Sequence, residues 1–252
     1  MPPQTAGKMP AVQRDAVSLA QIRLGNNMRR ASASFNDNDR AQVVRAVAEA
    51  ESSTSTEIVP AVATASGRYD RAEDIVGLWL GALLAVIVWF LFQGTDLRKP
   101  DWGFSLTRLE LPAILVVVVV GFVLGAVVAS QVGWLRALFT PRRQMRSEVD
   151  ARARQLFFDN RIHHTARATG LLIYVSLFER MAAIISDQTV IEKLGLPAIE
   201  ELCGELTRSL KSGNMTTAIC SAVKSAGQRL APVLPREAGD VNELPNALVL
   251  ID

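Results

Sequence analysis

Carboxylate side chains at the predicted ends of strands are the residues best suited to chemistry in this sequence. Glu57 begins one predicted strand, Asp70 follows that strand, and Asp187 ends another. Loops at strand ends are where binding and catalytic residues concentrate. A hard divalent cation such as calcium binds several converging oxygen atoms, so these three residues are the candidate metal ligands. The alternative for Asp187 is that it caps a helix beginning near Thr189.

Two other pairs of polar residues lie in predicted loops. Glu179 and Arg180 connect two strands at the end opposite to Asp187, so we do not expect them to share its site. They are candidates for a contact with a partner, or for an ion pair within the turn. Asn242 and Glu243 lie in the C-terminal segment, where they either contact a partner or hold a terminal loop in place.

Common catalytic signatures are absent from the sequence. It contains no G-x-x-x-x-G-K-[ST], G-x-G-x-x-G, G-x-S-x-G or H-E-x-x-H motif, which excludes the usual NTPase, dinucleotide, serine-hydrolase and zincin sites. The 27 Lys and Arg residues against 25 Asp and Glu leave a net charge of only +2, so no nucleic-acid partner is expected. Two cysteines are too few for a disulfide framework.

Helices and strands alternate in the segments that must position these residues. Thr56–Thr64 predicts a strand, in which Pro60 favours an edge or bulge position, and Leu171–Leu177 with Met181–Ser186 predicts a β-hairpin. Apolar periodicity, with capping residues such as Asn36, predicts the helices. The remaining expected elements are helices over Asp37–Ser53, Arg146–Arg161, Ile191–Leu210 and Thr216–Leu230, a short helix within Val17–Met28, and a last strand over Ala247–Ile251.

Two long uncharged runs explain why the mean hydropathy is as high as +0.20. Ile75–Phe92 and Leu111–Leu135 contain no charged residue. As helices they would extend roughly 27 and 37 Å, enough to cross a bilayer core of about 30 Å. All four tryptophans lie in or beside this region, as is typical of membrane interfaces. We therefore predict a two-span transmembrane hairpin, the alternative being two buried core helices.

The distribution of basic residues predicts how this hairpin is oriented. Six arginines directly follow the second run, between residues 136 and 154, whereas the connector over 93–110 holds three basic residues. Basic residues favour the cytoplasmic side, so both termini and the domain they carry are expected in the cytoplasm of an integral membrane protein, in the inner membrane if the chain is bacterial. The same arginines could also contact anionic lipid headgroups.

Glycines recur at a spacing of four residues within both runs. Gly77 and Gly81 lie in the first, and Gly121 and Gly125 in the second. Small residues at this spacing form one helix face and let two backbones approach closely. They predict packing of the hairpin against itself, with homodimerisation as the alternative.

The elements outside the hairpin predict one α/β domain that is split in sequence. Residues 1–34 form a tail, 35–71 the first part of the domain, 72–135 the hairpin, and 136–252 the second part. Neither part could bury a strand alone. A hairpin returns the chain to the side it left, so the insertion is compatible with a single domain.

Three segments resemble the TPM-domain family, which includes thylakoid-lumen photosystem-repair proteins and many uncharacterised bacterial membrane proteins. They are EAESSTSTEIVPAVATASGRYD (Glu49–Asp70), GLLIYVSLFERMAAIISD (Gly170–Asp187) and NELPN (Asn242–Asn246). The resemblance covers roughly residues 37–252 apart from the hairpin. It implies a mixed sheet flanked by helices, binding of a divalent cation such as calcium with Asp187 as the first candidate ligand, and either an acid-phosphatase-like activity or an assembly role.

Two functions are consistent with these observations. The first is a membrane-anchored, non-catalytic module that binds a protein partner, or a second copy of itself, and helps a membrane complex assemble. The alternative is a divalent-cation-dependent acid-phosphatase-like hydrolase. Transport is not expected, because the two predicted spans hold no charge that could form an ion path.

Overall fold

The computed structural model describes residues 20–21, 30–67, 70–93, 107–131, 140–165 and 167–252. The chain divides into two compact units, each treated by itself below. Residues 1–67 and 145–252 form the first unit, and residues 68–144 form the second. The segment that lies between the two sequence halves of the first unit is therefore a structural unit of its own.

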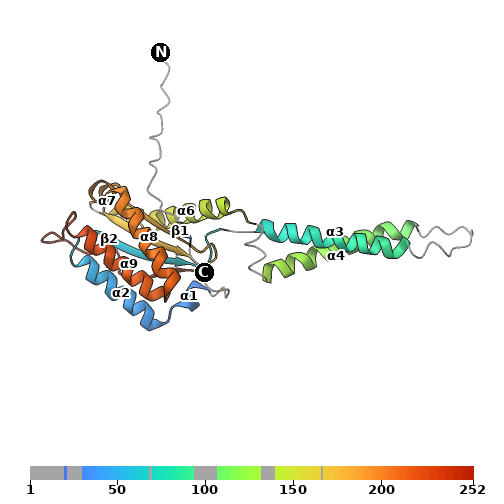
Figure 1. Ribbon diagram of the computed structural model, residues 1–252, viewed down its shortest axis with the longest axis horizontal. Helices are drawn as coiled ribbons and strands as arrows, with labels where there is room; N and C mark the ends of the chain where they lie inside the picture. Colours follow the sequence, from blue (N-terminus) through green and yellow to red (C-terminus); the bar gives the residue numbers. More distant parts are fainter. Residues whose placement is uncertain (1–19, 22–29, 68–69, 94–106, 132–139, 166) are drawn as a thin grey trace, which may run out of the picture. The chain divides into compact units, whose positions relative to one another are not determined.

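A mixed five-stranded sheet is the centre of the first unit (Figure 1). Its strand order is β1-β4-β3-β2-β5. β2 is parallel to both β3 and β5, whereas β3 pairs with β4, and β4 with β1, in the antiparallel sense. The strands are β1 Ala20–Gln21, β2 Glu57–Ala63, β3 Gly170–Ser176, β4 Met181–Ser186 and β5 Val249–Ile251. The expected α/β class with a mixed sheet is confirmed.

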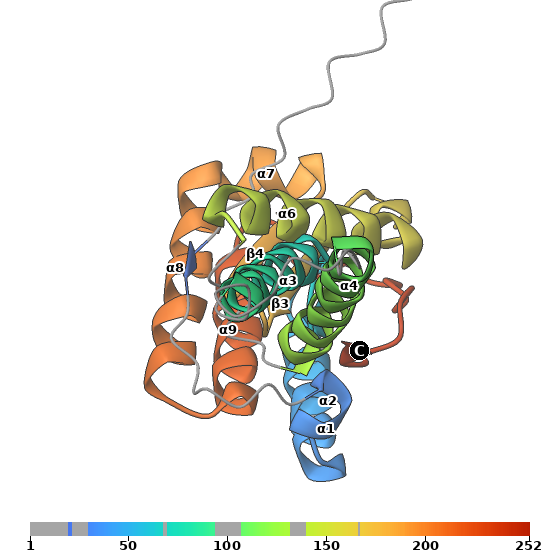
Figure 2. The same cartoon turned by 90° about the vertical axis from the view of Figure 1, so that its right-hand side faces the viewer.

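Helices cover both faces of this sheet, as Figures 1 and 2 show. On one face α2, α8 and α9 pack against Ile58, Ile173 and Ile184 in a single apolar core. On the other face, where Tyr174 points, α6 buries its own apolar side. The helices are α1 Ala31–Ser34, α2 Asp37–Glu51, α6 Arg142–Asp159, α7 Gln188–Leu194, α8 Leu196–Ser212 and α9 Met215–Leu230, with a 3₁₀ turn over Ile162–His164.

Every residue of β2, β3 and β4 is buried. Strands covered on both faces read as continuous apolar runs, which is why β3 and β4 were recognisable in the sequence. Polar groups able to bind a ligand must therefore lie at the two ends of the strands rather than on the sheet's faces.

The start of α2 follows the predicted capping pattern. The Asn36 side chain accepts a hydrogen bond from the Asp39 N–H at 2.8 Å, and the Asp39 carboxylate accepts one from the Asn36 N–H at 3.1 Å. This reciprocal capping box satisfies backbone donors that the first helical turn leaves unpaired. α2 is thus fixed at its N-terminus, and its other end leads directly to β2.

The single helix predicted over Ile191–Leu210 is wrong. α7 ends at Leu194 and α8 begins at Leu196, with Gly195 between them at a φ of 85°. This left-handed backbone favours glycine and ends a right-handed helix, and Pro197 fits the first turn of the next one. The apolar periodicity continues across the break, which is why it suggested one helix.

Two other predictions need correction. β2 is an interior strand, although Pro60 suggested an edge; β5 pairs only with Ala61–Ala63, so Pro60 lies just before that ladder. Within the helix predicted over Val17–Met28, Ala20–Gln21 is a strand paired with β4, and the rest lies outside the described residues. A ladder to a distant strand has thus overridden the local pattern.

The second unit contains two paired helices, α3 Asp70–Gln93 and α4 Thr107–Gln131. A Cβ added to Gly121 would lie 2.8 Å from the Cα of Gly81, and one added to Gly125 would lie 2.7 Å from the Cα of Gly77. The four predicted glycines therefore face one another between the two helices. The backbones approach there too closely for any side chain.

Among the described residues, one helical stretch is long and apolar enough to cross a membrane, Asp74–Leu91 in α3. Ile114–Val128 in α4 is a shorter apolar stretch. The predicted second span runs on to Leu135, and its last residues lie outside the part of the chain that the structure describes.

Candidate functional site

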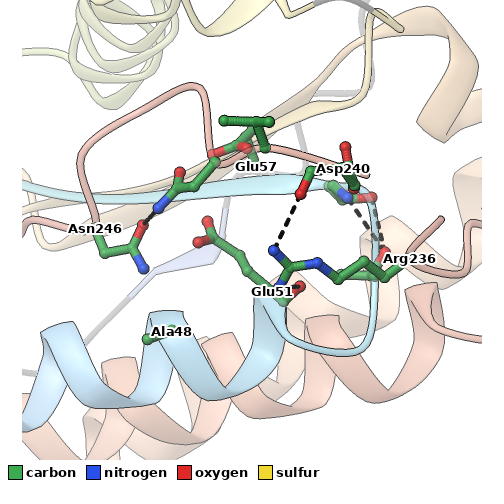
Figure 3. A pocket seen from close by; sticks show the side chains of 10 residues that line it. Ala48, Glu51, Glu57, Arg236, Asp240 and Asn246 are labelled. Atoms are coloured by element: carbon green, nitrogen blue, oxygen red, sulfur yellow. Dashed lines mark hydrogen bonds between the residues drawn. The ribbon is translucent and has the colours of Figure 1, made fainter. Parts of the chain in front are cut away.

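A hollow of about 180 Å³ lies at the end of the sheet where β2 begins (Figure 3). Its wall is formed by the end of α2 with the turn that leads into β2, and by the loop that precedes β5, which is distant from them in sequence. We call it the Glu51–Glu57 pocket. Its lining residues are Ala48, Glu51, Thr54, Thr56, Glu57, Arg236, Asp240, Val241, Asn242 and Asn246.

Glu51 is the last residue of α2, and its side chain turns toward the start of β2. Oε1 accepts a hydrogen bond from the Ile58 N–H at 2.9 Å. Oε2 is buried and has no hydrogen-bond partner. The side-chain amide of Asn246 approaches the same carboxyl group, as Figure 3 shows. One oxygen of Glu51 thus anchors the turn between α2 and β2, while the other makes no hydrogen bond.

Glu57, the first residue of β2, is arranged in the same way. The residue as a whole is buried, with only 9% of its surface exposed. Oε1 accepts a hydrogen bond from the Glu243 N–H at 3.1 Å, whereas Oε2 is buried without a partner. A buried carboxylate oxygen that accepts no hydrogen bond is unfavourable, so each such atom calls for an explanation.

The loop before β5 is held against the pocket by its own backbone. Thr54 donates its hydroxyl to the Leu234 carbonyl at 2.7 Å, and the Ser55 N–H donates to the same oxygen at 3.0 Å. The Arg236 guanidinium donates to the backbone carbonyls of Glu51 and Asp240 at 3.4 and 3.3 Å. Arg236 therefore holds the loop through carbonyl groups, and its hydrogen bonds do not reach the two unpaired carboxylate oxygens.

Burial sets the protonation behaviour of both acids. It raises the pKa of Glu51 to about 7; the nearby Glu57 adds to this rise, whereas the Ile58 N–H, Arg236 and Asn246 oppose it. Burial also raises the pKa of Glu57, helped by Glu243 and Asp240 and opposed by the backbone N–H groups of Glu243 and Leu244. Desolvation of the charged form is the main cause in both. The pocket is thus rich in hydrogen-bond acceptors, and near neutral pH it gains or loses a proton.

Of the three candidate metal ligands, Glu57 and Asp187 lie at the same end of the sheet. β2 and β3 pair Glu57 with Gly170, and the Gly170 N–H donates to the Asp187 carboxylate at 2.9 Å. Asp187 occupies the N-cap position of α7, yet its side chain makes no capping hydrogen bond. Its carboxylate instead closes the ladder between β3 and β4.

Asp70 begins α3 in the second unit, and its side chain lies outside the described part of the chain. Within the described residues, no group of three or more His, Cys, Asp or Glu side chains is placed to hold a metal ion. No observation in this part of the chain therefore favours the divalent-cation-dependent hydrolase over the binding module.

Glu179 and Arg180 lie at the opposite end of the sheet, as expected. Glu179 is buried; one carboxylate oxygen accepts hydrogen bonds from the Ser66 and Gly67 N–H groups at 2.7 and 3.3 Å, and the other accepts one from the Ser176 hydroxyl. Arg180 has a left-handed φ of 55°, which turns the chain between β3 and β4. Glu179 thus fixes the segment that leads out of β2.

Tyr174 belongs to the same end of the sheet. Its hydroxyl and that of Ser66 lie 2.8 Å apart. Burial, together with the charge of Glu179, raises the pKa of Tyr174 to about 12, so the phenol keeps its proton at neutral pH. This cluster is fully hydrogen-bonded to its own chain, which makes it a structural support rather than a binding site.

Sequence reasoning found part of the Glu51–Glu57 pocket. It named Glu57, and it named Asn242 and Glu243, which the structure brings to the same place. It missed Glu51 and Arg236. A signal for Glu51 was present, because it continues the spacing of four set by the buried residues Val43 and Val47. A carboxylate in line with a buried stripe indicates a desolvated acid.

Comparisons with known proteins leave the pocket unassigned. No family model matches this chain, and no curated protein matches it. A similar solved structure is the NMR structure of the BA42 protein from the psychrophilic bacterium Bizionia argentinensis. It is 16% identical, with a TM-score of 0.49, and the match covers 85% of this chain and 94% of that chain.

Proposed function

We propose that this protein is a membrane-anchored binding module, in which a two-span helical hairpin tethers a TPM-like α/β domain that binds a partner in a membrane complex. The TPM-like assignment is supported by the three sequence segments described above. Two of them, Glu49–Asp70 and Asn242–Asn246, supply most of the pocket lining.

The observation that carries the proposal is the outer surface of the α3–α4 pair. Within α3, the side chains of Leu78, Trp79 and Phe90 are 64%, 70% and 62% exposed. Within α4, Leu115 and Val119 are 63% and 60% exposed. Water-soluble helices bury such residues on one face, whereas helices surrounded by lipid expose them all round. A bilayer is the surrounding that makes this surface favourable.

The basic residues support a cytoplasmic position for the α/β domain. The first turns of α6 hold Arg142, Arg143 and Arg146, a few residues after the second predicted span. Arginines near the end of a span are retained on the cytoplasmic side. The domain then meets its partner at the inner surface of the membrane, where it is held close to other membrane proteins.

Membrane fractionation of the full chain tests the anchor. We expect the protein to stay in the membrane pellet after extraction with alkaline carbonate. Leu83→Arg places a charge on an outward-facing position in the middle of α3, which disfavours insertion by about 3 kcal/mol and should release a large fraction. Leu83→Ile is the matched control. Release of the unaltered chain by carbonate would contradict the proposal.

A reporter fused after Asp252 tests the orientation separately. A reporter that functions only in the cytoplasm should be active there. Activity of a reporter that functions only outside the cytoplasm would overturn the cytoplasmic assignment and leave the anchor itself standing.

A further inference from the structure

Among the described residues, no positively charged group donates a hydrogen bond to the side chain of Glu51 or Glu57 in the Glu51–Glu57 pocket. Two buried carboxylate oxygens, Oε2 of Glu51 and Oε2 of Glu57, border one hollow, and neither accepts a hydrogen bond. Figure 3 shows both carboxyl groups and the amide of Asn246 facing the same space. Removing two acceptors from water without supplying donors is unfavourable. A ligand that supplies both N–H donors and positive charge would reverse this.

We propose that the Glu51–Glu57 pocket binds the ammonium group of an amine, provided either by a lysine side chain of a partner protein or by a free alkylamine. The proposal rests on the proposed function in treating the α/β domain as a binding module, and it names the chemical group that the module recognises.

The charges of the lining favour a cation over an anion or a neutral group. Glu51, Glu57 and Asp240 face the hollow with one basic residue, Arg236, and Glu243 lies close enough to influence Glu57. Arg236 already donates to two backbone carbonyls at the rim. Three carboxylates against one guanidinium leave the pocket negative once its acids are ionised.

The number of acceptors suits an ammonium group better than a metal ion. An ammonium group carries three N–H donors. Oε2 of Glu51, Oε2 of Glu57 and the side-chain amide oxygen of Asn242, whose amide nitrogen donates to Asn246, provide three acceptors. Calcium takes about six to eight oxygen ligands, and within the described residues no group of three or more His, Cys, Asp or Glu side chains is placed to hold a metal ion.

The size of the hollow agrees with a single functional group. Its volume is about 180 Å³. Pockets that enclose a whole cofactor or drug-sized molecule measure roughly 300–1,000 Å³. The end of one long side chain, or a short alkylamine, fits the smaller space.

Binding must depend on pH because the ligand competes with protons. The pKa of Glu51 is about 7 when the pocket is empty. Between about pH 8 and pH 6 an alkylamine stays charged while Glu51 becomes protonated, so affinity should fall by about tenfold. The charged groups facing these two acids are Arg236, Asp240 and Glu243.

The test is a calorimetric titration at about pH 8, in which n-butylammonium is added to the full chain in lipid nanodiscs. We expect saturable binding that Glu57→Gln and Glu51→Gln each weaken at least about tenfold, by loss of a charge-assisted hydrogen bond. Glu49→Gln, an exposed change on the same helix, should leave it unaltered. Ala48→Leu, which adds bulk to the pocket lining without changing its charge, should also weaken it.

Three comparison ligands make the result specific. Tetramethylammonium carries the charge without N–H donors and should not bind. Calcium chloride should neither bind more tightly nor displace the amine. An acetylated Gly-Lys-Gly amide that binds more tightly than n-butylammonium identifies a partner's lysine as the source, and the reverse order identifies a free amine.

Specific outcomes would overturn the proposal. They are the absence of saturable n-butylammonium binding, equal binding by tetramethylammonium, tighter binding of calcium, or binding unchanged in both Glu→Gln variants. Carbonate-resistant membrane retention is measured on the same samples. It reports on the anchor alone, so failure of the amine site and failure of the proposed function are distinguishable.

Discussion

At the scale of single residues, Glu51 connects the stability of the α/β domain to pH. Its pKa is raised to about 7 in the folded chain, against 4.5 for an ordinary glutamate. The folded state therefore binds more protons than the unfolded state between these values, and stability falls as pH rises through that window. Ionised Glu51 therefore destabilises the folded state unless a ligand pairs with its carboxylate.

Replacing Glu51 by glutamine should remove most of this pH dependence. The raised pKa corresponds to at most about 3 kcal/mol, which partial exposure reduces to about 2 kcal/mol. We expect Glu51→Gln to unfold at higher denaturant than the unaltered chain at about pH 8, and at nearly the same concentration at about pH 5. Chemical unfolding monitored by far-ultraviolet circular dichroism measures the unfolding midpoint at each pH. Glu49→Gln should change neither, and a constant difference across pH would contradict the assigned pKa.

At Gly170, the addition of a single methyl group should strongly destabilise the α/β domain. A Cβ there would lie 2.1 Å from the Ile162 carbonyl oxygen and 2.6 Å from the Ile162 side chain. The backbone of β3 would have to move, although Asp187 holds the Gly170 N–H. We expect Gly170→Ala to destabilise the domain by roughly 3 kcal/mol or more, as overpacking of a rigid site does.

Gly204 provides the matched control for that change. It lies inside α8, and a Cβ there would meet no atom within 4 Å. Gly204→Ala should therefore stabilise the domain by up to about 1 kcal/mol through helix propensity. Thermal unfolding of the two variants gives the comparison. A similar effect of both substitutions would show that the contact with Ile162 does not restrict β3.

At the scale of elements, local sequence patterns predicted the interior of the fold better than its ends. β3 and β4 were recognisable because continuous apolar runs bounded by polar turns are typical of strands buried on both faces. The break at Gly195 and the pairing of Ala20–Gln21 were missed. One depends on a single backbone angle, and the other on a partner strand about 160 residues away in sequence.

The same distinction applies to the candidate site. Glu57 was predictable because it begins a strand, whereas the importance of Glu51 depends on a loop that returns from the far end of the chain. The Glu243 N–H reaches Glu57 across 186 positions of sequence. Long-range contacts of this kind leave little local trace, so the sequence could suggest the acids but not their burial.

Close helix packing in the second unit depends on its four glycines. At Gly121 an added Cβ would lie 2.8 Å from the Gly81 Cα and 2.9 Å from a Leu84 methyl group. Gly121→Leu should force α3 and α4 apart and destabilise their pairing by roughly 2 kcal/mol or more. Val119→Leu, an outward-facing change on α4, is the control. Cysteine crosslinking between the two helices in native membranes measures the separation, and equal crosslinking in both variants would contradict this packing.

At the scale of the whole molecule, the α/β unit holds together the two chain ends between which residues 68–144 are inserted. Glu179 holds the Ser66 and Gly67 N–H groups, so the end of the first sequence half is fixed. Gly67 in turn lies against Glu148 of α6, since a Cβ on Gly67 would be 2.7 Å from the Glu148 Cγ. The two ends of the interruption are thus neighbours within the same unit.

This neighbourhood predicts that the second unit can be removed. Glu148, whose side chain lies against Gly67, is about one helical turn after Met145, or roughly 5 Å along α6. A flexible linker of about six Gly and Ser residues covers that distance without strain. Replacing residues 68–144 by such a linker should give a water-soluble α/β unit, because its core of β2, β3, β4, α2, α8 and α9 lies wholly outside the removed segment.

The shortened protein should keep the properties of the α/β unit and lose those of the hairpin. We expect cooperative unfolding, the same pH dependence attributed to Glu51, and no retention in the membrane pellet. Combining the replacement with Glu179→Gln, which leaves buried N–H donors weakly paired, should lower the stability by about 1–3 kcal/mol. Glu200→Gln, an exposed change on α8, is the matched control. If the two units are independent, each keeps its own stability when the other is absent. Aggregation or non-cooperative unfolding of the shortened chain would therefore mean that the α/β unit needs the inserted residues to fold.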